Sequence, residues 1–349
     1  MTDFIQMHML TFYPPSNLNR DDTGNPKTCI VGGRERLRIS SQCLKRAWRT
    51  SDGFQNALAG HLGVRSKRVV HEHFYAKLVE GGVKEKDARK WTLEVVACFA
   101  SVDKKKKEEG PVYTGQLVHY SPAEITALED LAARLIASGT GPSDEDLKGL
   151  RGQGRAVDIA LFGRMLADHA GDNMDAAVQV SHAFSVNPSA QEGDYFTAVD
   201  DLNTREETGA GHLDVTGFGS GLFYTYLCIN RTQLTDNLGD EALVEKALRA
   251  LTEAAATVSP SGKQNSFAAQ SPAVYLVAEK GQGTPRSLAL AFHKPIPSDL
   301  LDKARAALDD TRHKLNTAYG APAHTYVFAP LDGQGTLAEL GAFVAGGAA

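Results

Sequence analysis

Residues 34–49 read RERLRISSQCLKRAWR, a basic stretch that also has the spacing of an amphipathic helix. Ser40 or Ser41 is a favourable N-cap, because a serine hydroxyl can accept a hydrogen bond from a free amide of the first helical turn. At about 100° per residue, the polar side chains share one face of this helix and the apolar ones share the other. The polar face holds Gln42, Lys45, Arg46 and Arg49, and the apolar face holds Cys43, Leu44, Ala47 and Trp48. We therefore expect a helix that packs on one side and presents cations on the other.

The charges of this stretch indicate a binding site for a polyanion. Its basic residues are Arg34, Arg36, Arg38, Lys45, Arg46 and Arg49, and its one acid is Glu35, in a protein with a formal net charge of -5. The helix dipole disfavours cations near a helix start unless an anion binds there. Several phosphates fit better than one, because the cations spread over ~15 residues and no glycine-rich loop precedes the helix. The alternative is a surface helix with solvated cations.

The composition is that of an ordinary soluble globular protein. The chain has 349 residues, 42% hydrophobic and 23% charged, enough for a large core and more than one lobe. No apolar run approaches the length of a membrane span and the N-terminus lacks the basic start of a secretion signal, so we expect a cytoplasmic protein. The four cysteines include no Cys-x-x-Cys pair, which favours buried thiols over disulfides or zinc.

Several motifs occur in an order and spacing that resemble those of one protein family. They are LNRDD at 18–22, GG at 32–33, RISSQ at 38–42, LKRA at 44–47, VDIAL at 157–161, GRM at 163–165, FTAVDDL at 196–202 and SG at 220–221. Together they closely resemble the CasC-type backbone subunit of the type I-E CRISPR Cascade complex. The resemblance covers the first fifty residues and roughly 155–232 well, the C-terminal part loosely, and 53–155 poorly.

The resemblance implies a non-catalytic protein without a cofactor. Several copies would assemble head to tail along a CRISPR RNA, hold its phosphates, and present its bases for pairing with target DNA in antiviral defence. Other Cascade subunits would be further partners. The protein would recognise the shape of the RNA backbone, while base pairing would recognise sequence.

The order of the expected elements predicts an α+β fold. Strand, helix, insertion, strand, arm, strand, helix and strand follow one another, which suits a βαββαβ sheet with two interruptions. The resemblance implies an RRM-like (ferredoxin-like) palm with an inserted helical fingers domain and a β-rich thumb. The expected boundaries are 1–52, 156–186 and 221–349 for the three parts of the palm, 53–155 for the fingers and 187–220 for the thumb arm.

Individual patterns locate the elements. We expect strands at Phe4–Phe12, ended by Pro14-Pro15, and at Val178–Val186, Leu222–Asn230, Val274–Ala278, Leu288–Phe292 and Thr325–Phe328. We expect helices at Arg89–Ala100, Pro122–Ala137, Leu243–Ala256 and Asp299–Tyr319. His8 is interpreted as a satisfied polar group of the core or a sheet face, and His182 as a hydrogen-bonded core histidine.

Further candidate RNA contacts lie outside the basic stretch. Besides Arg34, Arg38, Ser40, Gln42, Lys45, Arg46 and Arg49, they are Arg20, Asp22, Gly163, Arg164, Met165, Lys263 and Gln264. The loop that holds Arg20 and Asp22 approaches the RNA in the resembled family, and Lys263 and Gln264 lie in a polar loop. In residues 163–165, glycine allows close approach, arginine can hold a phosphate and methionine can wedge against a base.

The arm at 187–220 is rich in glycine and in acidic residues. Between Glu192 and Glu207 there are six acids and one base, Arg205. Acids repel phosphates, so we expect the arm to touch bases or a basic surface of another copy. Its candidate contacts are Tyr195, Phe196 and Val199, with Met165 supporting them.

Two other classes of function compete with this one. A metal-dependent nuclease or phosphoesterase would use Asp21, Asp22, Asp158 or the pair Asp200-Asp201, although no histidine is spaced to complete such a site. A protein-only filament subunit would self-assemble without RNA. The run Lys104–Lys107 favours a solvated loop, with DNA contact as the weaker option.

Overall fold

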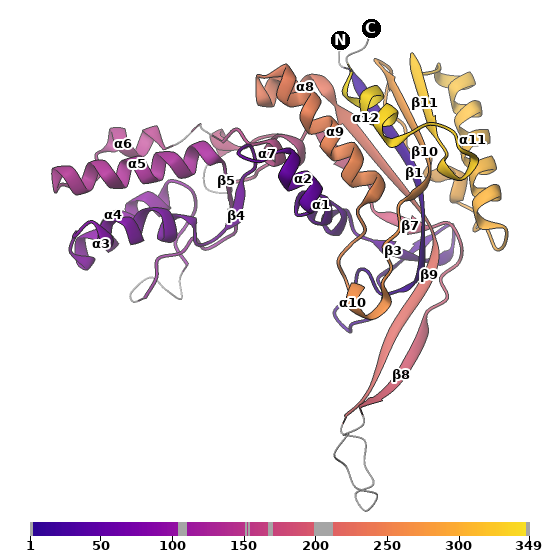
Figure 1. Cartoon of the computed structure of the whole chain (residues 1–349), viewed down its shortest axis with the longest axis horizontal. Coiled ribbons are helices and arrows are strands. Elements are labelled where there is room, and N and C mark those ends of the chain that lie inside the picture. The colour runs from indigo at the N-terminus through magenta and orange to yellow at the C-terminus, as the bar shows by residue number, and fades with distance from the viewer. Residues whose placement is uncertain are drawn as a thin grey trace, which may run out of the picture. The chain divides into compact units, whose positions relative to one another are not determined.

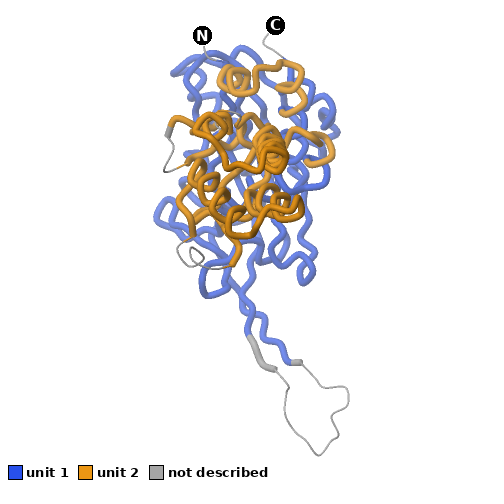
Figure 2. Tube along the Cα trace, turned by 90° about the vertical axis from the view of Figure 1, so that its left-hand side faces the viewer, with its two compact units in different colours: residues 1–54, 179–230, 248–349 blue, residues 55–178, 231–247 orange. Residues whose placement is uncertain are grey.

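The computed structural model describes residues 3–103, 110–150, 152, 154–166, 170–198 and 212–346. It divides into two compact units, coloured separately in Figure 2. The sheet unit comprises residues 1–54, 179–230 and 248–349, and the helical unit comprises residues 55–178 and 231–247. Residues 156–178 pack with the helical unit, whereas the sequence analysis assigned them to the predicted palm. The palm, fingers and thumb boundaries stay a prediction.

The sheet unit is built on one antiparallel sheet (Figure 1). Its order is β11-β10-β1-β9-β7-β3-β2, and β6 and β8 also pair with β9. The strands are β1 Phe4–Ser16, β2 Thr28–Val31, β3 Arg34–Ile39, β6 Val178–Val180, β7 Ala183–Ser185, β8 Glu192–Ala198, β9 His212–Asn230, β10 Ala273–Gly281 and β11 His324–Phe328. Together with the helices described in the next paragraphs, this sheet confirms the predicted α+β class.

Strand β1 is central because both of its faces are apolar. Ile5 and Met7 are buried on one face and Leu10 on the other, and the strand pairs with β9 and β10 along its length. The prediction that Pro14-Pro15 ends the strand was wrong. The two prolines, which have no N–H to donate, lie in a bulge, and pairing resumes where Ser16 meets Gly219.

The sheet unit also contains helical segments. They are α1 Ser41–Arg49, α10 Gln264–Phe267, η4 Ala289–Phe292, α11 Leu300–Tyr319, η5 Pro330–Asp332, α12 Leu337–Ala345 and the C-terminal part of α9 Glu241–Thr257. Helix α11 and η4 share a core with Leu10, Tyr224 and Val277. The strand expected at Leu288–Phe292 was wrong, because this segment forms a 3-10 turn in which the Leu288 amide donates to the Tyr224 hydroxyl.

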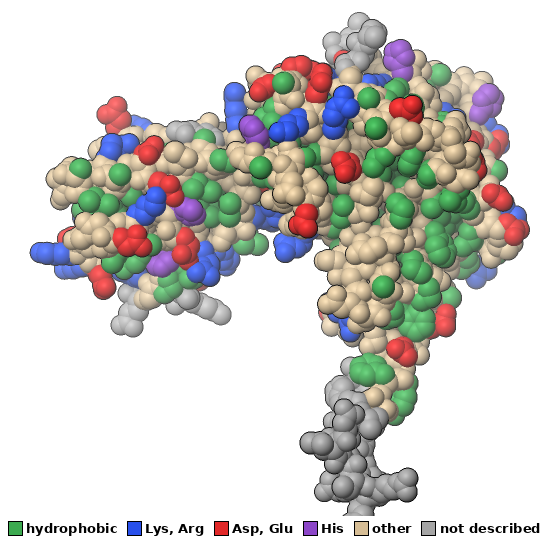
Figure 3. All heavy atoms as spheres, viewed as in Figure 1, with side chains coloured by type: hydrophobic (Ala, Val, Ile, Leu, Met, Phe, Trp, Pro, Cys, Tyr) green, Lys and Arg blue, Asp and Glu red, His purple; other side chains and the backbone are tan. Residues whose placement is uncertain are grey.

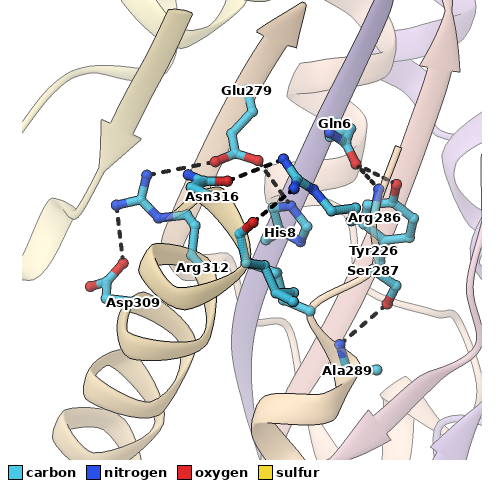
Figure 4. A network of polar contacts seen from close by, with 12 residues as sticks. Gln6, His8, Tyr226, Glu279, Arg286, Ser287, Ala289, Asp309, Arg312 and Asn316 are labelled. Atoms are coloured by element: carbon cyan, nitrogen blue, oxygen red, sulfur yellow. Dashed lines mark hydrogen bonds and ion pairs between the residues drawn. The ribbon is translucent and has the colours of Figure 1, made fainter. Parts of the chain in front are cut away.

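A polar network lies between β1, β10 and α11 (Figure 4). His8 is fully buried, contacts the Tyr224 hydroxyl through Nδ1 at 3.0 Å, and lies 3.6 Å from Glu279. Arg312 pairs with Glu279 from α11. Burial lowers the pKa of His8, which is therefore neutral in the fold. The interpretation of His8 as a satisfied polar group of the core is confirmed.

The helical unit has its own core. Its elements are β4 Val64–Ser66, η1 His71–Tyr75, α3 Ala76–Glu80, α4 Glu85–Ala97, β5 Val118–Tyr120, α5 Pro122–Ser138, α6 Asp144–Gly149, α7 Val157–Phe162, η3 Ala170–Asp172, α8 Arg231–Leu238 and the start of α9, with α2 Asp52–Ala57 at its N-terminal boundary. Phe74, Trp91 and Leu128 pack at its centre. Helix α5 begins at a capping box formed by Ser121 and Glu124. None of the described helices combines the length and apolar character that crossing a bilayer requires.

Candidate nucleic-acid interface

Helix α1 begins where the sequence predicted. Ser40 is its N-cap, and the Ser40 hydroxyl accepts a hydrogen bond from the Cys43 amide at 3.3 Å. The Ser40 amide donates to Asn19 Oδ1 at 2.8 Å, so a loop ahead of the strand also holds the cap. Ser40 is buried and Trp48 is 1% exposed. The hydroxyl of Ser40 therefore starts the helix, and Trp48 anchors it.

The polar face of α1 is accessible to different degrees. Gln42 and Arg46 are exposed, whereas Lys45 and Arg49 are half-buried. Burial lowers the pKa of Lys45, since an ammonium loses hydration there. A bound phosphate would offset this cost. The helix thus carries cations whose environment favours an anion.

The hairpin of β2 and β3 leads into α1 and distributes the arginines of the basic stretch. Arg34 is exposed and Arg38 is half-buried, with its Nε donating to Thr28 O at 3.3 Å. Gly32 and Gly33 make the turn with positive φ, and a Cβ on Gly32 would lie 1.7 Å from the His293 carbonyl oxygen. Only glycine fits that close approach.

Arg36 is buried, so the basic stretch offers one cation fewer to a ligand than its sequence suggests. It is 0% exposed, and Nη1 donates to the carbonyls of Ser185 at 2.9 Å and Val186 at 2.7 Å. Nη2 donates to the Phe292 carbonyl at 3.0 Å. This guanidinium therefore joins β3 to β7 and η4 and is not available to an external phosphate.

The loop at 17–27 holds Arg20 and Asp22, both exposed. Asp21 caps its turn by accepting from the Thr23 hydroxyl and amide and from the Asn25 amide, and these bonds lower the pKa of Asp21. Lys27 ends the loop and was missed in the sequence. Its carbonyl accepts from the Arg38 amide at 2.7 Å, so Lys27 lies beside the end of β3. A lone lysine at the end of a turn-rich loop gave no signal of its own.

Two further segments pack against this loop. Asn17 Nδ2 donates to the Gly217 carbonyl at 2.8 Å, which ties the loop to the base of the arm. A Cβ on Gly262 would lie 2.2 Å from the Leu18 carbonyl oxygen, so the segment at 259–267 lies directly on the loop. Within that segment, Gln264 Nε2 donates to the carbonyls of Pro260 and Ala269. Gln264 thus holds its own segment, and Lys263 is the half-exposed cation beside it.

The arm is a hairpin of β8 and β9, paired from Glu192↔Phe218 to Ala198↔His212. Tyr195 is 64% exposed, its cross-strand neighbour Val215 is 60% exposed, and Phe196 is 39% exposed. Figure 3 shows hydrophobic and acidic side chains along the described part of the arm. Val199 and the pair Asp200-Asp201 lie outside the described residues.

The GRM motif belongs to the helical unit. Gly163 ends α7 with φ 81°, and Met165 is 79% exposed. Arg164 is buried, pairs with Glu124 at 2.8 Å, and donates to the carbonyls of His119 and Asp172. Arg164 and Glu124 bind each other inside the helical unit. Arg164 is therefore a structural residue, and its guanidinium does not reach an external phosphate.

Among the described acidic candidates for a hydrolytic site, Asp158 is held by structural contacts. Asp158 is buried, pairs with His119 at 2.8 Å, and accepts from the Gly63 amide. Within the residues that the structure describes, no group of three or more His, Cys, Asp or Glu side chains could hold a metal ion. The run Lys104–Lys107 lies outside those residues.

His182 differs from its interpretation as a core histidine. The strand expected at Val178–Val186 is two short strands, and His182 lies exposed between them. Its Nδ1 accepts from the Ser41 amide at 2.8 Å, at the first residue of α1. It is hydrogen-bonded as expected, but outside the core.

Comparisons with known proteins agree with this arrangement. The family model described as CT1975-like protein matches residues 5–342. A chain of a "CRISPR RNA-guided surveillance complex, pre-nicking" superposes with a TM-score of 0.82 and 31% identity, covering 93% of this chain and 90% of that chain. A chain of a "CRISPR RNA-guided surveillance complex" gives a TM-score of 0.72 and 26% identity, covering 93% and 91%. No curated protein gives a significant match. Because the family model spans nearly the whole sequence, the chain belongs to the CT1975-like protein family, which confirms its resemblance to CasC-type backbone subunits of Cascade.

Proposed function

We propose that this protein is a non-catalytic, RNA-binding backbone subunit of a cytoplasmic Cascade complex in antiviral defence. Several copies would assemble head to tail along a CRISPR RNA and present it for pairing with target DNA, together with the other subunits. The observation that carries the proposal is α1, a capped helix with a buried apolar face and a cationic polar face. The likeness to subunits of RNA-guided surveillance complexes supports it.

The contacts to the RNA would come from loops and α1 rather than from the sheet. In RRM proteins, bases stack on aromatic side chains of an exposed sheet face. Here Tyr224 is buried on the sheet and Tyr226 donates its hydroxyl to Gln6. The palm would therefore be RRM-like in topology, while Arg20, Lys27, Arg38 and Lys45 hold phosphates. When a protein holds an RNA only through its phosphates, the bases of that RNA stay free to pair.

The arm would contact bases of the RNA on a neighbouring copy. Its exposed Tyr195 and Phe196 offer aromatic faces, and the acids Glu192 and Asp194 beside them repel phosphates. Stacking on an aromatic side chain contributes ~1 to 3 kcal/mol per base and tolerates any sequence. Met165 would support these aromatic side chains, and the helical unit would be the fingers.

The test is to purify the protein with and without a CRISPR RNA. We expect ordered assemblies with a high ratio of 260 to 280 nm absorbance only when RNA is present, and no cleavage of labelled RNA or DNA in Mg²⁺ or Mn²⁺. Equal assemblies without RNA would favour a protein-only filament. Specific cleavage that is lost in Asp22→Ala would favour the nuclease, because Asp22 is exposed and outside the structural bonds of Asp21.

A further inference from the structure

His182 lies at the start of α1 because of strand pairing. Strand β7 pairs with β3 through Arg38↔Phe184 and Ile39↔Ala183. The residue ahead of Ala183 therefore lies beside the residue that follows the end of β3, where α1 begins. The Ser41 amide donates to His182 Nδ1 at 2.8 Å, and the imidazole is exposed.

This hydrogen bond fixes the tautomer of the ring. A neutral imidazole that accepts at Nδ1 carries its proton on Nε2. Among the described residues, Nε2 of His182 has no hydrogen-bond partner, and it is not buried. The ring therefore presents one unused N–H donor to the surroundings of the helix start.

The groups around the ring are cationic. Partial burial lowers the pKa of His182, and the charges of Arg38 and Lys27 lower it further. Partial burial and the two cations thus favour the neutral ring at pH 7, and the cations would attract a phosphate to the same place.

Three amides at the start of α1 already have acceptors within the chain. The Ser41 amide is bound to His182, the Cys43 amide to the Ser40 hydroxyl, and the Leu44 amide to the Ser40 carbonyl. A ring that accepts a hydrogen bond on one nitrogen becomes a stronger donor on the other, because successive hydrogen bonds polarise one another. The partial positive charge of the helix start is thereby transmitted to Nε2.

We propose that His182 is an RNA-contacting residue that donates its Nε2–H to a backbone phosphate, between Lys27 and Arg38. This inference rests on the proposed function and adds to it a neutral donor that fixes the register of the RNA on α1. Lys27 and Arg38 attract the phosphate by their charge, whereas the hydrogen bond from Nε2 fixes its position.

Two variants of the full chain separate contact from capping. In His182→Asn, the amide oxygen can accept from Ser41 in place of Nδ1, but no donor reaches the position of Nε2. In His182→Gln, the longer amide places a donor near that position and loses the acceptor for Ser41. Binding of a single-stranded RNA is measured for both variants and for the wild type at several salt concentrations, with melting temperatures of the free proteins.

We expect His182→Asn to bind about tenfold more weakly with an unchanged melting temperature, because a hydrogen bond to a charged group is removed. Its salt slope should equal that of the wild type, since a neutral donor releases no counterion. His182→Gln should keep most of the affinity and melt at a lower temperature. A purely structural role would instead misplace the cations of α1 and reduce the salt slope.

The outcomes are distinguishable. If the wild type binds RNA and His182→Asn binds equally well, the role of His182 is overturned and the proposed function stands. If both variants weaken in proportion to their loss of melting temperature, His182 only caps the helix. If the wild type does not bind RNA, both proposals are overturned.

Discussion

Arg36 shows how one buried residue can position a surface site. Its three hydrogen bonds to Ser185, Val186 and Phe292 hold β3 against β7 and η4, directly ahead of α1. We expect Arg36→Met to lose about 3 to 5 kcal/mol of unfolding free energy, because three buried carbonyls lose their donors. Arg36→Lys should lose nearly as much, since one ammonium cannot span this fork. Urea unfolding without RNA measures the change.

Arg34→Met is the matched control for Arg36. Arg34 lies on the same strand and is exposed, so its replacement should change stability by less than about 0.5 kcal/mol. Equal losses in the two variants would show that the buried hydrogen bonds are not what stabilises this strand.

The cations of α1 carry a prediction about binding rather than stability. Lys45→Glu combined with Arg49→Glu should abolish RNA retention while the fold persists, because neither side chain belongs to the buried face. A single replacement such as Lys45→Ala should lower the salt slope of RNA binding by about 0.7 for each phosphate that the protein no longer neutralises. Salt-dependent binding of a single-stranded guide is the measurement.

Lys303→Glu combined with Lys314→Glu is the control for the net charge. Both lysines are exposed on α11 and pair with Asp299 and Asp310, so the charge change is the same at a different place. Affinity should fall far less in this control. If both double variants lose RNA equally, global charge and not α1 governs binding.

At the scale of elements, the polar network of β1, β10 and α11 predicts a pH dependence. Burial depresses the pKa of His8 in the fold, so the unfolded chain binds a proton that the folded chain excludes. Stability is therefore present above the unfolded pKa of about 6.5 and falls as pH decreases below it, by up to ~1.4 kcal/mol per pH unit for one proton. Urea midpoints at pH 7 and pH 5 give the dependence.

His8→Gln should flatten this part of the pH profile, because glutamine keeps a polar group and does not titrate. The exposed His313 on α11 supplies the control, since His313→Gln removes an imidazole that lies outside the buried network. An identical loss between pH 7 and pH 5 in the wild type and in His8→Gln would contradict the assignment. Glu279, whose pKa is lowered by its hydrogen bond to His8 and by Arg312 despite burial, contributes only as pH falls below the unfolded glutamate pKa of about 4.3.

Local patterns predicted elements better than they predicted what those elements touch. The start of α1 at Ser40 and the central place of β1 follow from capping chemistry and from a strand apolar on both faces. The burial of Arg36 and the exposure of His182 depend on pairing of β3 with β7, which lies about 145 residues away in sequence. Arg164 likewise meets Glu124 from another helix. The sequence counted Arg36 among the cations of a polyanion site and marked Arg164 as a phosphate ligand, because sequence does not reveal a distant partner.

At the scale of the whole molecule, the described part of the arm presents apolar side chains to solvent. The ladder of β8 and β9 leaves Tyr195, Phe196 and Val215 exposed, and an exposed apolar surface on a hairpin marks an interaction site. Its base, by contrast, is fixed, since Asn17 binds the Gly217 carbonyl and Gln191 binds the Pro26 carbonyl. In the proposed assembly the arm would meet a different surface on the next copy, and such a heterologous contact forms an open filament where the rotation between copies does not close a ring.

Replacing residues 190–218 by a short Gly-Ser linker should therefore leave a folded subunit that binds short RNA through Lys45 and Arg49. It should fail to form long ordered assemblies, and base-modifying reagents should lose any periodic pattern along the guide. Tyr195→Ser combined with Phe196→Ser keeps the backbone of the arm and removes its aromatic faces. This double variant therefore separates the effect of the arm's length from the effect of base stacking. Assembly without a periodic reactivity pattern along the guide in this double variant would assign the base contacts to the aromatic pair. If the deletion assembles normally with the same periodicity, the arm does not space the copies, and the spacing must come from the sheet or helical units.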